Sequence, residues 1–171
     1  PGAGGGLSLL HRPRSQGAHD LRRLANGNTV FLAWDVVPQD VEVRIPGGLP
    51  DTRHADGCMY GDCIYEIGRD GKVAWEWQAW RDMEVERYPI AAGQKRDEFA
   101  HANAIEPLAN GDYMLSFRRL NSIVIVDRAT RRVRWEQRDE SWGMQHDCTM
   151  LADGNILLFA NGAGTPGNPF S

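Results

Sequence analysis

Apolar residues in this chain come in short runs of strand length, separated by pairs of turn-forming residues. Segment 19–32 aligns without a gap on segment 146–159, and each has an Asn-Gly or Asp-Gly pair between two apolar runs. A third copy, 101–115, matches from its leucine onward and has its histidine two residues earlier. Because such pairs supply the positive φ angles that a tight two-residue hairpin requires, each copy predicts a β-hairpin.

A second repeated unit alternates with the first. Segment 63–76 has two apolar runs around Asp70-Gly71, and segment 122–136 repeats them with a turn one residue longer. Two successive hairpins make a four-stranded antiparallel sheet, and a ring of such sheets avoids exposed strand edges. We therefore expect an all-β fold, a β-propeller fragment of about two and a half four-stranded blades.

The spacing of the histidines that begin these repeats locates insertions. His101 and His146 are 45 residues apart, close to the length of one propeller blade, whereas His19 and His101 are 82 residues apart. The additional residues fall within 35–60 and 80–100, which are rich in proline, glycine and charge. The first blade is thus expected to carry two insertions.

The composition is consistent with an all-β fold and argues against nucleic-acid binding, a membrane span and a metal site. The 19 glycines and 9 prolines are spread along the chain, which indicates many turns. A net charge of −4 provides no basic surface for nucleic acid, and the apolar runs are too short to span a membrane. No metal site is expected, because Cys58, Cys63 and Cys148 lack ligand spacing. We expect a leading segment, 1–18, from a preceding blade or linker, and an incomplete propeller domain, 19–171.

The repeat also predicts where functional side chains meet. In a propeller the first strand of each blade lies nearest the central channel, so residues at its start gather at one mouth. His19, His101 and His146 occupy this place. Asn103 follows on the same strand face as His101, and Arg118 ends the next strand, so both are expected at the same mouth. Each histidine taken alone can instead satisfy a hydrogen bond between blades.

Several neighbouring residues have structural interpretations. Arg119, directly after Arg118, is expected to form part of a solvated pair. Trp75 and Trp135 match in the repeat and are predicted to pack between blades. Two histidines outside the repeat are interpreted as surface residues: His11 and His54.

Three short strings occur together and in order in the second half of the chain. They are His101-Ala-Asn103, Ser116-Phe-Arg118 and Gln145-His146-Asp147, the last leading into segment 153–162. Generic propeller repeats share the Asn-Gly hairpins and the tryptophan but lack this combination. With it, the chain resembles the arylsulfate sulfotransferase family over residues 19–162, most strongly after Phe99.

The resemblance implies a six-bladed propeller that moves a sulfuryl group from a phenolic sulfate ester to another phenol without a nucleotide donor. It implies that His146 is the nucleophile and forms a sulfohistidine. It further implies that His101, Asn103 and Arg118 hold the sulfuryl oxygens and that His19 contributes from the first blade. The partners are then an aryl sulfate and a phenol, with no cofactor. A periplasmic or extracellular location is compatible with the resemblance, and the sequence specifies neither the location nor the oligomeric state.

These residue types suit that chemistry. A neutral imidazole nitrogen is a competent nucleophile near pH 7, and a covalent intermediate divides the transfer into two easier steps. Cationic and hydrogen-bonding groups stabilise the charge on the outer oxygens of the transferring group. A histidine can alternately protonate the leaving phenolate and deprotonate the incoming phenol, and the sequence does not choose between His19 and His101.

Two other functions stay open on the sequence alone. A non-catalytic propeller would display loops to a protein or carbohydrate partner and would tolerate the loss of any one histidine. A quinone-dependent dehydrogenase shares the tryptophan-marked blades, and it would show a bound quinone by absorbance. Fold alone does not separate these functions, because one fold serves many.

Overall fold

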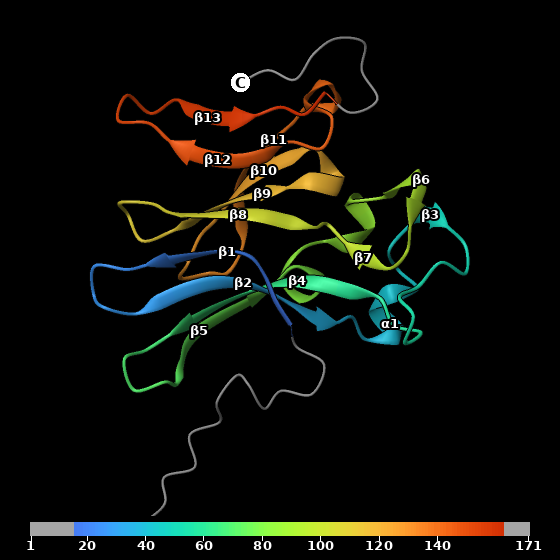
Figure 1. Cartoon of the computed structure of the whole chain (residues 1–171), viewed down its shortest axis with the longest axis horizontal. Coiled ribbons are helices and arrows are strands. Elements are labelled where there is room, and N and C mark those ends of the chain that lie inside the picture. Colours follow the sequence, from blue (N-terminus) through green and yellow to red (C-terminus); the bar gives the residue numbers. More distant parts are fainter. Residues whose placement is uncertain (1–15, 163–171) are drawn as a thin grey trace, which may run out of the picture.

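The computed structural model describes residues 16–162 as an all-β fold, in which thirteen strands are joined by turns and very short helices (Figure 1). Within this range no helix is long and apolar enough to cross a membrane. Of the expected leading segment, 1–18, only residues 16–18 are among the described residues. His11 lies outside them. The first strand already begins at Gln16, before the expected domain boundary at His19.

The first sheet contains both hairpins that the repeat predicts for the first blade. Its strands follow the order β1-β2-β4-β5 and are antiparallel, while β7 adds to β4 in parallel. The register joins Thr29 to Ile67 and Val36 to Tyr60 without a break. The strands are Gln16–Arg23 (β1), Thr29–Val36 (β2), Tyr60–Ile67 (β4), Val73–Gln78 (β5) and Glu98–Phe99 (β7).

The second sheet repeats the order of the first, and the third begins it again. The second is antiparallel in the order β11-β10-β9-β8, and the third pairs β12 with β13. Strand β8 lies between β1 and β12, so the first strands of the three sheets are neighbours (Figure 1). The strands are Ala102–Pro107 (β8), Tyr113–Phe117 (β9), Ser122–Val126 (β10), Val133–Arg138 (β11), His146–Met150 (β12) and Ile156–Phe159 (β13).

The hairpin turns differ from the two-residue turns that the Asn-Gly and Asp-Gly pairs predict. In the first, the amide of Leu24 donates to the carbonyl of Asn28, and the amide of Gly27 donates to the carbonyl of Leu24. This is a three-residue loop, in which a type I turn is followed by a left-handed glycine, with Gly27 at φ +83°. The same bonds recur at Gly71, Gly111 and Gly154. The loop after Asp127 is one residue longer, as predicted.

The sheets stack face to face around two apolar cores. The larger joins the first sheet to the second and the smaller joins the second to the third. Fully buried members of the larger core include Leu32, Ile64, Trp77, Leu115 and Phe117. Buried members of the smaller core are Ala104, Met114, Ile123, Ile125 and Cys148. Apolar burial between repeated sheets is therefore what holds consecutive repeats together.

The two expected insertions fold against each other beside the first sheet. Strand β3 pairs with β6 in parallel, and the Arg96 guanidinium donates to the carbonyls of Ile45 (3.0 Å), Gly47 (2.6 Å) and Glu42 (2.9 Å). These bonds fasten one insertion to the other. The inserted elements are Gln39–Glu42 (α1), Gly47–Leu49 (β3), Ala79–Asp82 (α2), Val85–Arg87 (η2) and Ile90–Lys95 (β6).

The matched tryptophans have different surroundings. Trp75 is 8% exposed, and its Nε1 donates to the carbonyl of Arg128, 3.0 Å away in the outer turn of the second sheet. This confirms the predicted packing between repeats. Trp135 is 38% exposed, contrary to expectation. The described part of the third sheet contains only β12 and β13, so it has no outer hairpin where Arg128 lies in the second sheet.

A buried carboxylate also joins the first two sheets. Glu66, on β4, is 1% exposed and accepts hydrogen bonds from Asn28 Nδ2 (2.6 Å), Tyr113 OH (2.9 Å) and Arg128 Nη2 (2.7 Å). Burial would raise the pKa of Glu66, but these hydrogen bonds outweigh it and hold that pKa below its ordinary value. The ionised form of Glu66 is thus the one that the fold stabilises.

We predict that Glu66→Ala lowers the free energy of unfolding by about 2–4 kcal/mol, because it leaves Arg128 and Tyr113 without their acceptor. Denaturant unfolding measures this loss, and Glu140→Ala, at an exposed ion pair, should cost less than about 0.5 kcal/mol. Because the pKa of Glu66 is lowered on folding, its contribution is present above the ordinary glutamate value of 4.5 and declines as the pH falls through the lower folded value. Equal losses for both variants would contradict the assignment.

Candidate active site

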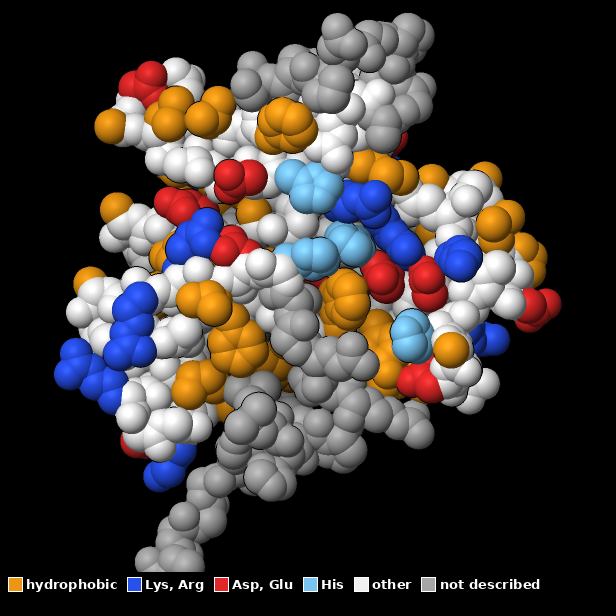
Figure 2. All heavy atoms as spheres, viewed as in Figure 1, with side chains coloured by type: hydrophobic (Ala, Val, Ile, Leu, Met, Phe, Trp, Pro, Cys, Tyr) orange, Lys and Arg blue, Asp and Glu red, His pale blue; other side chains and the backbone are white. Residues whose placement is uncertain are grey.

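The three repeat histidines stand in or directly beside three neighbouring strands. His19 is in β1, His101 directly precedes β8, and His146 begins β12. The rings of His19 and His101 are 4.8 Å apart, and His146 is near enough to influence the pKa of His19. Figure 2 shows histidine side chains grouped at the middle of this face, beside arginine side chains. The structure thus brings the rings of His19 and His101 into contact, with His146 near His19.

Backbone irregularities accompany the histidine position in all three strands. The pairing register shifts across 18–21 in β1, 102–104 in β8 and 146–148 in β12. His19 and His101 have positive φ angles, of 36° and 58°. β-Bulges re-aim side chains and are common beside active sites.

The Trp34 indole contacts both His19 and His101, and the buried Asp62 carboxylate accepts a hydrogen bond from that indole. The Trp34 ring centroid is 5.7 Å from those of both His19 and His101. Its Nε1 donates to Asp62 Oδ1 at 3.1 Å, and the amide of Ala102 donates to the same oxygen at 2.8 Å. Burial raises the pKa of Asp62 to about 7, against the hydrogen bond from Ala102. The sequence analysis missed both residues, since Asp62 lies in an otherwise apolar run.

The His101 ring is held by a carboxylate from the second insertion. Its Nδ1 is hydrogen-bonded to Glu98 Oε2. Arg119 in turn lies 3.6 Å from that oxygen and 2.8 Å from Asp97 Oδ1. The interpretation of Arg119 as a solvated residue was therefore wrong: it is 14% exposed and ties the segment before β8 to the helical turn Arg118–Leu120 (η3). Glu98 was also missed, although it stands only three residues before a predicted site residue.

Asn103 and Arg118 each donate a hydrogen bond to a backbone carbonyl of the residue that directly precedes a first strand. Asn103 Nδ2 donates to the carbonyl of Gln145 at 2.7 Å, and the Arg118 amide donates to the carbonyl of His101 at 2.9 Å. The buried Gln145 amide donates to Ser116 Oγ and to two carbonyls, which fixes the residue before His146. Among residues 16–162 the Arg118 guanidinium forms no ion pair with a carboxylate, whereas the neighbouring Arg119 forms two.

His146 has one polar contact that bears on its reactivity. Its Nδ1 lies 3.3 Å from Asn161 Oδ1, just beyond β13. An amide oxygen can only accept, so with the Asn161 amide in this orientation the contact favours the tautomer that has its proton on Nδ1 and its lone pair on Nε2. His146 is half-buried and follows the helical turn Glu140–Trp142 (η4). Asn161 belongs to one of the strings that carry the family resemblance, but the sequence analysis gave it no role.

Burial and neighbouring charges both act on the pKa of His19. Partial burial lowers the pKa of His19, and the neighbouring charges of His101, His146 and Arg118 lower it further, while Glu98 opposes them. The neutral imidazole is therefore favoured at this position near pH 7. His54 is 51% exposed and belongs to the insertions, so its interpretation as a surface residue is confirmed.

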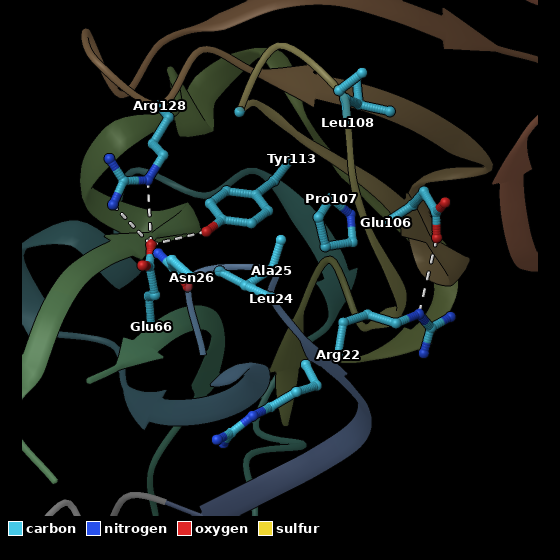
Figure 3. Close-up of a pocket in the computed structure, with 13 residues that line it drawn as sticks. Arg22, Leu24, Ala25, Asn26, Glu66, Glu106, Pro107, Leu108, Tyr113 and Arg128 are labelled. Carbon is cyan, nitrogen blue, oxygen red and sulfur yellow. Dashed lines mark hydrogen bonds and ion pairs between the residues drawn. The ribbon is translucent and has the colours of Figure 1, made fainter. Parts of the chain in front are cut away.

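A separate cavity lies between the turns that end the first hairpins of the first two sheets (Figure 3). Its volume is about 670 Å³. Arg128 and Tyr113 on its wall both bond to Glu66, and Arg22 Nε lies 3.8 Å from Glu106 Oε2 (Figure 3). These hydrogen bonds and ion pairs connect the first sheet to the second. We therefore interpret the cavity as part of the junction between the two sheets rather than as a reaction site. In residues 16–162 no cluster of three or more His, Cys, Asp or Glu side chains is arranged to hold a metal ion.

The fold and this site define an all-β protein of stacked antiparallel sheets, with imidazole, guanidinium and amide groups converging from separate sheets. The chain belongs to the arylsulfotransferase (ASST) family, whose model matches residues 15–169. A crystal structure of a protein of unknown function from Bacteroides caccae is 10% identical with a TM-score of 0.47. That match covers 86% of this chain but only 39% of the other. A search of curated proteins found no match.

Proposed function

We propose that this protein transfers a sulfuryl group from an aryl sulfate donor to a phenolic acceptor through a sulfohistidine on His146. The observation that carries the proposal is the grouping of His19, His101 and His146 on three neighbouring strands. Membership of the arylsulfotransferase family supports aryl sulfotransfer over the non-catalytic and dehydrogenase alternatives.

In the first step His146 Nε2 attacks sulfur, an N–S bond forms, and the S–O bond to the donor aryl group breaks while a general acid protonates the leaving oxygen, so that a phenol departs. In the second, the acceptor oxygen attacks sulfur while a general base takes up its proton, an S–O bond forms, and the N–S bond breaks. The contact of Nδ1 with Asn161 supports this role, because it directs the lone pair to Nε2. A covalent intermediate of this kind predicts ping-pong kinetics.

Arg118 and Asn103 would stabilise the sulfuryl oxygens as the S–O bond breaks. The Arg118 guanidinium has no carboxylate partner among residues 16–162, and the Asn103 amide has a second N–H besides the one bonded to Gln145. Donors fixed before the reaction stabilise developing charge without reorganisation. The bonds from Gln145 to β9 and β10 support that preorganisation.

The activity itself can be tested with the full-length protein. With 4-nitrophenyl sulfate and phenol it should form 4-nitrophenol and phenyl sulfate in equal amounts, with no nucleotide added. Without an acceptor, release should stop after one stoichiometric burst. Continuous hydrolysis without an acceptor, or no turnover, would contradict a transferase.

We propose further that the chain from β1 onward is an incomplete β-propeller domain, that the residues before β1 belong to a preceding blade or linker, and that the whole propeller has six blades. The repeated strand order supports this, as does the free outer edge of β13 within the described range. In a complete blade an outer hairpin would cover Trp135 as the turn at Arg128 covers Trp75.

If the chain is part of a complete propeller, Trp75 and Trp135 should contribute equally to the free energy of unfolding, although their exposures differ in the described structure. In the full-length protein Trp135→Ala should lower the free energy of unfolding by about 3–5 kcal/mol, as Trp75→Ala does, because both would be packed between blades. Denaturant unfolding of the two variants makes the comparison. A loss below about 1 kcal/mol for Trp135→Ala alone would show that no further hairpin covers it.

A further inference from the structure

Glu98 is the carboxylate through which the second insertion reaches the histidine cluster. It lies in β7, three residues before His101, and its Oε2 is hydrogen-bonded to His101 Nδ1. Arg119, 3.6 Å from the same oxygen, anchors Glu98 from the opposite side. Burial would raise the pKa of Glu98, but the bond to His101 and the charge of Arg119 hold it below its ordinary range. Glu98 is thus a carboxylate at neutral pH.

His19, the other candidate proton carrier, has different surroundings. Its ring contacts the rings of Trp34 and His101. Partial burial and the charge of His101 favour its neutral form. A neutral histidine cannot give a proton to a leaving phenolate, whereas an imidazolium can be stabilised by a carboxylate on its far nitrogen.

We infer that Glu98 is a positioning residue that makes His101, rather than His19, the proton carrier of the reaction. This inference rests on the proposed function. It assigns a role to the insertion between the first and second repeated sheets: the segment ending in β7 supplies a partner that the repeats themselves lack.

The proton balance of both steps follows from this geometry. With Nδ1–H donating to Glu98, the exchangeable site of His101 is Nε2. In the first step the His101 imidazolium gives its Nε2 proton to the leaving aryl oxygen as the S–O bond breaks, and a neutral phenol departs. In the second step neutral His101 takes the proton of the acceptor hydroxyl as that oxygen attacks sulfur. Glu98 stays ionised throughout.

The test uses single-turnover sulfation of His146 in the full-length protein with a series of aryl sulfates. The donors run from 4-nitrophenyl sulfate, whose phenolate leaves readily, to phenyl sulfate, whose phenolate needs protonation. The variants are Glu98→Gln and, as the matched control, Asp97→Asn, which removes the neighbouring carboxylate that also bonds Arg119. A burst rate constant does not depend on the fraction of folded protein, so partial misfolding leaves the readout intact.

For Glu98→Gln we expect a loss of about 10–100-fold with phenyl sulfate and less than about threefold with 4-nitrophenyl sulfate. Asp97→Asn should stay within about twofold of the wild type on both donors. In a His101→Gln background, Glu98→Gln should have no further effect. If the burst persists but Glu98→Gln lowers the sulfation rate equally for all donors, the inference is overturned. The same holds if Asp97→Asn lowers that rate as much as Glu98→Gln does. A wild type without any burst would refute the proposed function and this inference with it.

Discussion

Replacing His146 with asparagine should abolish both the burst of phenol release and the transfer to an acceptor. Asparagine keeps a polar group near the position of Nδ1 but has no nucleophilic nitrogen at the position of Nε2, so the covalent step has no substitute. We expect a fall in kcat/KM of at least about a thousandfold, the scale seen when a covalent nucleophile is removed. Steady-state release of 4-nitrophenol in the presence of phenol measures it.

The control for this variant is His54→Asn, at an exposed histidine in the insertions. It should leave kcat/KM within about twofold of the wild type, because surface substitutions away from a site have small effects. A His146→Asn protein that keeps a tenth or more of the wild-type activity would show that another group carries the sulfuryl moiety.

Arg118→Ala should slow sulfation by about a hundredfold to a thousandfold and leave the site of labelling unchanged. Removing one preorganised charge donor typically costs this much in kcat, and the nucleophile itself stays in place. Arg118→Lys should recover part of the rate, because a lysine restores the charge but not the planar pair of donors. Single-turnover kinetics with 4-nitrophenyl sulfate separate the three proteins.

The exposed Arg87, 70% accessible, provides the matched arginine control. Arg87→Ala should not change the sulfation rate measurably. If Arg118→Ala sulfates His146 as fast as Arg87→Ala does, then Arg118 does not contact the transferring group and the proposed charge stabilisation must come from elsewhere.

The repeated elements were largely predictable from sequence because their signals are local. Each Xaa-Gly pair between apolar runs does form a hairpin turn, and the longer turn after Asp127 was read from its spacing. The turn type was predicted incorrectly. Only the glycine of each pair takes a positive φ, as Gly27 and Gly111 show, because the preceding residues form a type I turn. A dipeptide signal does not distinguish a two-residue loop from a three-residue one.

Most of what the sequence analysis missed depends on long-range contacts. The bulges beside His19 and Asn103 leave no mark in the apolar pattern, since one unpaired residue looks like any other strand residue. The insertions have no repeat to align, so the position of Glu98 against His101 came only from the fold. Asp62 is buried and accepts a hydrogen bond from Trp34 on another strand, a contact that the sequence around either residue does not predict. The convergence of the histidines was predictable because the repeat itself specifies it.

The covalent state on His146 is the central claim, and trapping it tests that claim most directly. The full-length protein is incubated with excess 4-nitrophenyl sulfate and no acceptor, then digested and mapped by mass spectrometry. We predict a sulfuryl group on the peptide that contains His146, formed in the same amount as the phenol released in the burst. A label on His19 or His101, or phenol release that begins only when an acceptor is added, would contradict the assignment of His146 as the covalent carrier.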